Sequence, residues 1–302
     1  MKRKTTKLIL IPLFALSISL AGCGSYTGTI DKEIETVENN YIETDVKKNG
    51  ESKEQKFVTV EETVILDQKD IVITAKGIES SFMGTELKIL IENNSDKNLT
   101  FQTRNASVND FMAEAMFSED VAAGKKSNTS ITFMNNGLEN FGMDMFANME
   151  FSFHVFYTEN WDTYFDSELI NVETSIASTY EQKVDDSGNI LYENNGIKIV
   201  AKGLSSDDSY IGPGLVLYIE NNSDKNFTVQ VRDVSVNGFM INTIMSQDVI
   251  AGKKAIDSVT FLNSSLEENG ITDIENIEIS FHIFNMNTWD DIVDTEPIII
   301  NF

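Results

Sequence analysis

Ser152 and His154 stand two residues apart, and Ser280 and His282 repeat this spacing further along the chain. A serine nucleophile needs a base within hydrogen-bond reach of its hydroxyl. Both pairs lie in segments that alternate like β-strands, where residues two apart are about 6.5–7 Å distant along the backbone. We therefore expect no catalytic Ser–His couple. We expect each histidine on the solvent-facing or inter-strand face of its strand.

The 48 acidic residues produce carboxylate pairs such as Asp207-Asp208, but none has the spacing of an EF-hand loop. One cysteine and two histidines are too few for a Cys- or His-rich zinc cluster. Gly124–Lys126 lacks the flanking residues of a phosphate-binding loop. Asp186–Gly188 is one Asp-Ser-Gly without the second carboxylate of aspartic proteases. The sequence predicts no metal site, no cofactor and no enzymatic activity.

Two Trp-Asp pairs lie between the last two predicted strands of each half of the chain, and an arginine recurs on an earlier polar strand face. We take these as candidate partner-binding residues: Trp161, Asp162, Trp289, Asp290, Arg104 and Arg232. An exposed tryptophan at a loop could anchor a partner, because tryptophan is enriched at binding hot spots. The alternative, which we favour on sequence alone, is that each tryptophan plugs the open end of its domain.

The elements that must position these residues occur twice. Residues 91–98 recur without change at 219–226, an offset of 128, and Trp161-Asp162 and Trp289-Asp290 share that offset. Repeats of this size are independent domains rather than solenoid units. We expect domains at residues 57–176 and 191–302, joined by a linker at 177–190.

Short alternating segments and turn residues dominate both repeats. Phe227–Asp233 alternates apolar and polar residues, and Asn237-Gly238 predicts a two-residue hairpin turn with two positive φ angles. Only Leu138–Met145 and Leu266–Ile274 suggest short helices. The pattern predicts an all-β fold, with two tandem immunoglobulin-like antiparallel β-sandwich domains.

Net charge excludes one class of partner. The chain has 23 basic and 48 acidic residues, a formal charge of −25. Nucleic acids are bound chiefly through Lys and Arg contacts to phosphates. A DNA- or RNA-binding role is therefore not expected.

The N-terminus combines a basic start, an apolar stretch at 8–20 and Leu20-Ala21-Gly22-Cys23. The stretch is too short to span a bilayer. The four residues resemble the lipobox of bacterial prolipoproteins. That resemblance implies a signal peptide at 1–22, lipidation of Cys23, and attachment to the extracytoplasmic face of the cell membrane. Highly charged residues follow, and we expect a flexible tether at 23–56.

The two repeats also resemble immunoglobulin-like domains of unknown function found in tandem in lipoproteins of Gram-positive bacteria. The Asn-Asn-Ser turn, the hairpin at Ser235–Gly238, the Ala-Gly-Lys-Lys segment and the strand at Phe281–Phe284 carry this resemblance. It implies a fold and a surface location, and no enzymatic activity.

The function that the sequence favours is a membrane-anchored, non-catalytic binding module, held through the lipid on Cys23. Its ligand would be an envelope protein or a glycan. Two alternatives are a solute-binding receptor for a transporter and a carboxylate-dependent cell-envelope hydrolase. The first usually needs alternating strands and helices, and the second needs two facing carboxylates in a groove; the sequence shows neither pattern.

Overall fold

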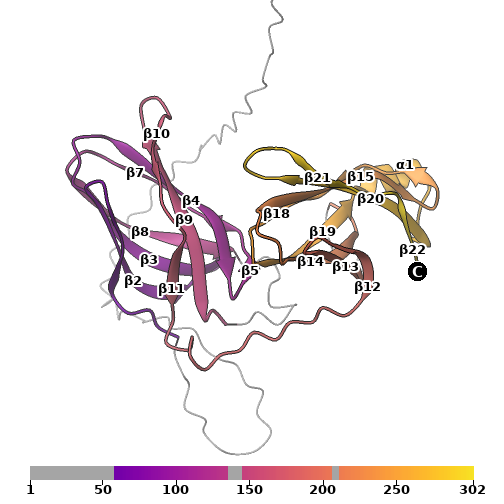
Figure 1. The fold of residues 1–302 in the computed structure, drawn as a ribbon, viewed down its shortest axis with the longest axis horizontal. Helices are drawn as coiled ribbons and strands as arrows, with labels where there is room; N and C mark the ends of the chain where they lie inside the picture. Colours follow the sequence, from indigo (N-terminus) through magenta and orange to yellow (C-terminus); the bar gives the residue numbers. More distant parts are fainter. Residues whose placement is uncertain (1–57, 135–144, 206–210) are drawn as a thin grey trace, which may run out of the picture. The chain divides into compact units, whose positions relative to one another are not determined.

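A computed structural model describes residues 58–134, 145–205 and 211–302 (Figure 1). The predicted signal peptide, Cys23, the tether at 23–56, nearly all of the helix predicted at Leu138–Met145 and the Asp207-Asp208 pair lie outside the described residues. No helix in the described part of the chain is long and apolar enough to cross a membrane.

The described chain consists of β-sheets, antiparallel in all but one short strand pair, and one short helix, which confirms the all-β, immunoglobulin-like sandwich prediction. The described residues of the first repeat form eleven strands: β1 Thr63–Gln68, β2 Ile71–Ser80, β3 Gly84–Asn93, β4 Leu99–Val108, β5 Phe111–Met112, β6 Ala115–Met116, β7 Ser118–Val121, β8 Lys125–Met134, β9 Asn148–Tyr157, β10 Thr163–Asp166 and β11 Ile170–Glu173. One sheet has the order β1-β2-β3-β8-β6. In the other, β4 pairs with β5, β7 and β9, and β9 pairs with β10 and β11.

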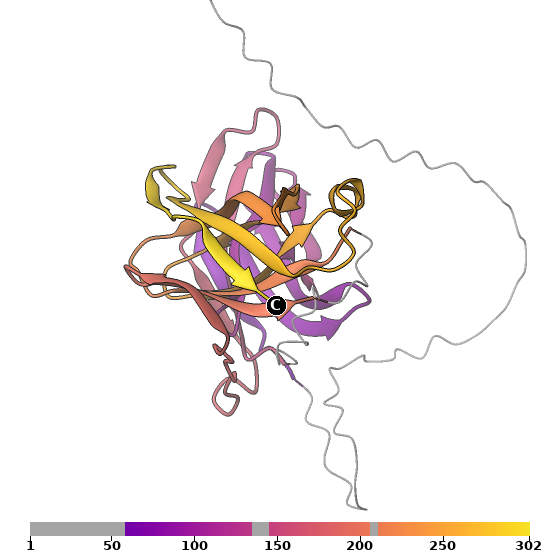
Figure 2. The ribbon, with the colours of Figure 1, turned by 90° about the vertical axis from the view of Figure 1, so that its right-hand side faces the viewer.

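The second repeat has the same strands in the same order, drawn orange to yellow in Figure 2. They are β12 Asn189–Asn194, β13 Ile197–Leu204, β14 Gly214–Asn221, β15 Phe227–Val236, β16 Phe239–Met240, β17 Thr243–Ile244, β18 Ser246–Val249, β19 Lys254–Phe261, β20 Asn276–Asn285, β21 Asp291–Asp294 and β22 Ile298–Asn301, with α1 at Asn263–Glu268. Strands β15 and β20 pair with each other, as β4 and β9 do.

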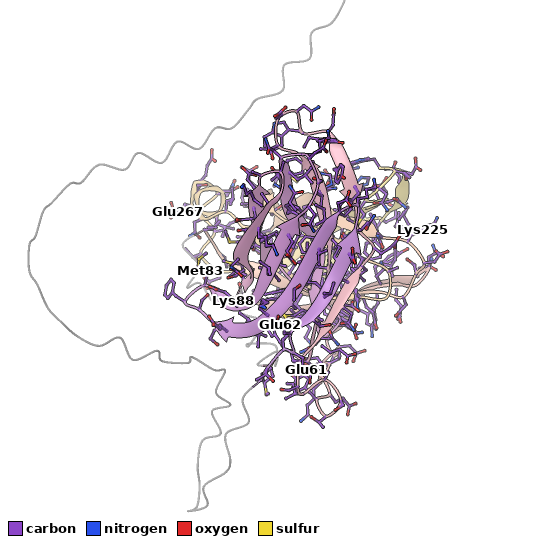
Figure 3. The ribbon with its side chains drawn as sticks, turned by 90° about the vertical axis from the view of Figure 1, so that its left-hand side faces the viewer. Glu61, Glu62, Met83, Lys88, Lys225 and Glu267 are labelled. Carbon is purple, nitrogen blue, oxygen red and sulfur yellow. The ribbon has the colours of Figure 1, made fainter. Side chains whose placement is uncertain are left out.

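Each repeat buries its own apolar cluster between its two sheets. In β3, every second residue from Thr85 to Asn93 is buried, as expected for a strand with one side facing a core. The first core contains Phe101, Phe151 and Phe153, with the rings of the latter two meeting edge to face at 5.5 Å. The opposite side of the sheet that contains β3 is charged: Figure 3 shows Glu62 and Lys88 on it, and Lys88 pairs with Glu79 and Glu86.

The predicted hairpin at Asn237-Gly238 is confirmed. Val236 pairs with Phe239 across it, and the two turn residues have φ angles of 51° and 83°. Its counterpart in the first repeat, Asn109-Asp110, also has two positive φ angles, 49° and 68°. These short polar residues tolerate the left-handed conformation that a two-residue hairpin requires.

Two predicted boundaries differ from the structure. Strand β12 begins at Asn189, inside the segment expected to be linker. The helix expected at Leu266–Ile274 spans Asn263–Glu268 instead. It ends early because Gly270 has a φ of +66°, and a left-handed glycine just after the last helical turn terminates a helix.

Candidate functional site

The outward side of the β4–β9 strand pair holds a row of polar and aromatic residues. Gln102 lies opposite His154, and Arg104 lies opposite Ser152. Their neighbours along the strands, including Phe153, face the core. Because strand residues alternate between the two faces of a sheet, Arg104 and His154 share one side. The same arrangement recurs on β15 and β20.

Each histidine is held by an aspartate from the next strand. The Nδ1 atom of His154 lies 2.6 Å from Oδ1 of Asp166, and that of His282 lies 2.7 Å from Oδ1 of Asp294. Both histidines are buried. Of the two settings expected, the inter-strand one is found: each imidazole contacts an aspartate of the next strand and a neighbouring phenylalanine.

The serines take no part in these pairs. The Ser152 hydroxyl donates to the Arg104 carbonyl oxygen at 3.4 Å and accepts from the Asn105 amide at 3.3 Å. The imidazole of His154 is directed to Asp166 instead. The arrangement therefore resembles a structural His–Asp pair on a strand, and it does not form a nucleophile–base couple.

An arginine approaches the same aspartate in each repeat. The Arg104 guanidinium lies 3.8 Å from Asp166, and that of Arg232 lies 3.6 Å from Asp294. About half of each arginine side chain is exposed. The structure thus brings each predicted arginine to the aspartate at the end of the short strand that follows the predicted Trp-Asp pair.

The tryptophans form the outer layer of a ring stack. In the first repeat the rings of His154 and Phe156 are 5.2 Å apart, and Trp161 stacks on Phe156 at 5.3 Å with an interplanar angle of 16°. The second repeat has the same stack, with Trp289 5.5 Å from Phe284 at 15°. The tryptophans are nevertheless 72% and 74% exposed. The interpretation that they plug the ends of the sandwiches is therefore wrong.

Both tryptophans occupy a strained backbone position. Their φ angles are +66° and +64°. A bulky residue in the left-handed region is an outlier, with a cost of roughly 1–2 kcal/mol relative to its ordinary conformation. Ring stacking offsets about 0.5–1.5 kcal/mol of that cost. Glycine would avoid the strain, so the fold alone does not account for tryptophan at this position.

A five-residue loop sets this geometry. In the first repeat the loop at 158–162 joins β9 to β10, and in the second the loop at 286–290 joins β20 to β21; both loops extend beyond their strands in Figure 1. The Trp161 N–H donates to the Tyr157 carbonyl, and the Tyr157 N–H donates back to the Asp162 carbonyl, each at 2.9 Å. We call this loop, with the phenylalanine, histidine and aspartate beneath it, the tryptophan tip. It comprises 154–166 in the first repeat and 282–294 in the second.

The motif at 93–98 supports the tip from the side. The Asn93 side chain is fully buried and makes four hydrogen bonds: its amide donates to the carbonyls of Lys97 and Val121, and its oxygen accepts from the N–H and hydroxyl of Ser95. The carbonyl of Asn98 then accepts from the N–H of Thr158, the first residue of the tip loop. These bonds account for the identity of Asn93 and Ser95 in both repeats, because Asn221 and Ser223 make the same bonds in the second.

The Ala-Gly-Lys-Lys segment meets the same turn. The N–H of Ala123 donates to the Asn98 side chain at 3.1 Å, and the N–H of Gly124 donates to the Ser95 carbonyl at 3.1 Å. In the second repeat the N–H of Ala251 donates to Asn226 at 2.9 Å. Three motifs that are separate in the sequence therefore meet at one end of each sandwich.

Outward and inward positions have diverged differently between the repeats. The outward residues on the paired strands are identical at the offset of 128: Thr100/Thr228, Gln102/Gln230, Arg104/Arg232, Ser152/Ser280, His154/His282 and Phe156/Phe284. Several inward residues differ: Phe101/Val229, Phe151/Ile279 and Val155/Ile283. Apolar exchanges are tolerated in a core, and exposed substitutions usually change stability by less than about 0.5 kcal/mol. Among these outward residues only the arginines are exposed, so stability alone does not require the identity of Arg104 and Arg232.

The inner residues of the tips carry little signal in the sequence. Asp166 and Asp294 are 12 residues from their histidines, on a neighbouring strand, so spacing did not connect them. The signal that could have found them is their identity at the repeat offset, because neighbours such as Phe165 and Val293 differ. Phe156 and Phe284 have no sequence signal beyond their place in alternating strands.

The remaining motifs have structural explanations. The Asp185 carboxylate accepts hydrogen bonds from the N–H and hydroxyl of Ser187, at 3.0 and 2.6 Å, which forms a local turn at the Asp-Ser-Gly segment. These bonds, together with Lys202, lower the pKa of Asp185 to about 2. Across residues 58–134, 145–205 and 211–302, no group of three or more His, Cys, Asp or Glu side chains is placed to hold a metal ion.

Comparisons with known proteins give no relative in sequence. No protein-family model matches the chain, and no curated protein matches it. Among solved structures, the YadV chaperone aligns with a TM-score of 0.24 and 11% identity, covering 78% of this chain and all of the chaperone. The Salmonella enterica SafA pilin in complex with the SafB chaperone aligns with a TM-score of 0.20 and 10% identity, over 72% of this chain and 89% of the matched chain. At these TM-scores the likenesses carry no conclusion about this chain.

Proposed function

We propose that the chain is a lipoprotein on the extracytoplasmic face of a bacterial cell membrane, and that it acts without catalysis as a binding module. Its contact surfaces are the two tryptophan tips. The observation that carries the proposal is that each repeat exposes an indole in a strained, left-handed position. Strain at an exposed residue is typical of functional sites.

Physical arguments support the tips as binding surfaces. Each indole lies on a phenylalanine, which in turn lies beside a histidine held by an aspartate. The ring therefore loses little conformational freedom when a partner covers it, and less lost freedom means a lower entropic cost of binding. Large aromatic side chains supply much of the energy at protein interfaces. Two such surfaces on one chain also allow bivalent attachment.

The chemistry of the tips favours binding over catalysis. The histidine and aspartate of each pair are directed to each other, and the serine on the same face is bonded elsewhere. The described strands form sandwiches without alternating β-strand and helix units. No observation therefore favours the transporter-receptor or hydrolase alternative.

A panel of immobilised ligands tests the binding surface. The panel holds cationic, anionic and neutral peptides, peptidoglycan fragments and neutral oligosaccharides, and it is probed with the full-length protein in mild detergent. We expect at least one class to bind wild type and to lose at least about tenfold in affinity with Trp161→Ala/Trp289→Ala. The matched control, Phe82→Ala/Phe239→Ala, removes two exposed aromatic residues outside the tips and should bind normally. Binding that survives in the tryptophan variant would contradict the proposal.

The lipid anchor has a separate test. Cells that express the full chain are labelled with a radioactive fatty acid. Wild type and a Ser25→Ala control should take up label, and Cys23→Ser should not. A Cys23→Ser protein that still carries the label would show that the lipid is attached elsewhere.

A further inference from the structure

The tryptophan tips carry negative charge beside the exposed indole. Asp162 and Asp166 are exposed in the first repeat, and Asp290, Asp291 and Asp294 are exposed in the second. The arginine near each tip already lies against Asp166 or Asp294. Asp162 and Asp290 follow the tryptophans directly. In the described structure their side chains accept hydrogen bonds from neutral groups of their own loops, the Asn160 amide and the Thr288 hydroxyl.

An indole face attracts cations through its quadrupole, and nearby carboxylates strengthen that attraction. One face of each ring is covered by phenylalanine, which leaves the opposite face to a ligand. The β9–β10 hairpin already holds one ammonium in this way, because Lys69 lies 5.4 Å from the ring centre of Tyr164. The chain as a whole carries a formal charge of −25, which attracts cationic partners over longer distances and repels anionic ones.

We propose that each tryptophan tip binds a Lys- or Arg-rich segment of a protein partner, with a cationic side chain on the free face of the indole and Asp162 or Asp290 beside it. This inference rests on the proposed function and specifies its ligand. The negative charge of the tips is complementary to a cationic segment, which is why we favour this ligand. An anionic wall polymer or lipid surface would be repelled, and a neutral glycan would use the indole but not the carboxylates.

The chain offers a direct optical readout, because Trp161 and Trp289 are its only tryptophans. Tryptophan emission, excited at a wavelength that the tyrosines do not absorb, therefore reports on the tips alone. The full-length protein is titrated at low ionic strength with an eight-residue arginine peptide, an eight-residue glutamate peptide and a neutral chitin hexasaccharide. We expect a saturable emission change with the arginine peptide only, and an affinity that falls as salt is added.

Charge variants that leave the tryptophans in place then test the role of the carboxylates. Asp162→Asn/Asp290→Asn should weaken arginine-peptide binding by about fivefold or more, since each removes one exposed charge interaction. The matched control, Glu61→Gln/Glu267→Gln, removes the same net charge from exposed positions outside the tips and should bind within about twofold of wild type (Figure 3).

The outcomes separate this inference from the proposed function. Failure of the arginine peptide to change the emission, or equal weakening by the tip and control charge variants, would overturn the inference. Binding of the hexasaccharide that is lost in Trp161→Ala/Trp289→Ala would also overturn it, yet it would support the tips as binding surfaces. If no panel ligand depends on the tryptophans, the proposed function itself is wrong.

Discussion

Replacing Asn93 with alanine should destabilise the first repeat strongly, because this side chain joins the turn at 93–98 to β7. Four hydrogen bonds of 2.6–3.1 Å end on its amide group. Each such bond contributes about 0.5–1.5 kcal/mol net, and partners left buried and unbonded cost more. Asn93 is fully buried, so water does not replace it without rearrangement. We expect a loss of about 2–4 kcal/mol in the free energy of unfolding.

Urea unfolding followed by tryptophan emission measures this loss. A Trp289→Phe background makes the emission report on the first repeat alone, because only Trp161 remains. The control is Asn94→Ala, at an exposed position in the same turn, with an expected change below about 0.5 kcal/mol. If Asn93→Ala loses less than about 1 kcal/mol, or no more than the control, the buried side chain does not hold the turn and the reasoning is refuted.

Two further predictions concern backbone strain and pH. The free energy of unfolding of Trp161→Gly should exceed that of Trp161→Ala by about 1 kcal/mol, because only glycine adopts a φ of +66° without strain. Equal urea midpoints for the two variants would show that the tip is unstrained. The Asp185 carboxyl should titrate near pH 2 by NMR, and Ser187→Ala should move its pKa up toward the ordinary 3.8, because the hydroxyl bond is lost. Since this pKa is lower in the folded state, the stabilisation is present above about pH 4 and is lost as the pH falls through about 2; an unchanged pKa in the variant would contradict the assignment.

Local turn chemistry and strand alternation were predictable from sequence. Asn237-Gly238 forms its hairpin because few residues other than Asn and Gly accept two positive φ angles. The helix boundary was missed because apolar spacing through Ile274 suggested a longer helix, whereas Gly270 ends it after Glu268. The spacing of apolar residues does not indicate where a helix ends when the terminating glycine lies within the apolar pattern.

The candidate site was predicted in its outer residues and missed in its inner ones. The Trp-Asp pairs and arginines stand out because they recur at one offset, and each arginine lies against the aspartate that ends the strand after the Trp-Asp pair. Exposure of Trp161 could not be inferred, because the same residue type at a loop either fills a core or faces solvent. That choice depends on the left-handed φ and on the Phe156 ring beneath it, which are products of the folded hairpin.

Acrylamide quenching of the two tryptophans, with and without the arginine peptide, tests the central claim most directly. In the free protein we expect quenching close to that of a small tryptophan derivative in water, because the indoles are 72% and 74% exposed. Saturating peptide should lower the quenching constant at least about twofold, since a ligand on the free face of the indole shields it. Weak quenching of the free protein, or a constant that does not change when labelled peptide is shown to be bound, would contradict the account.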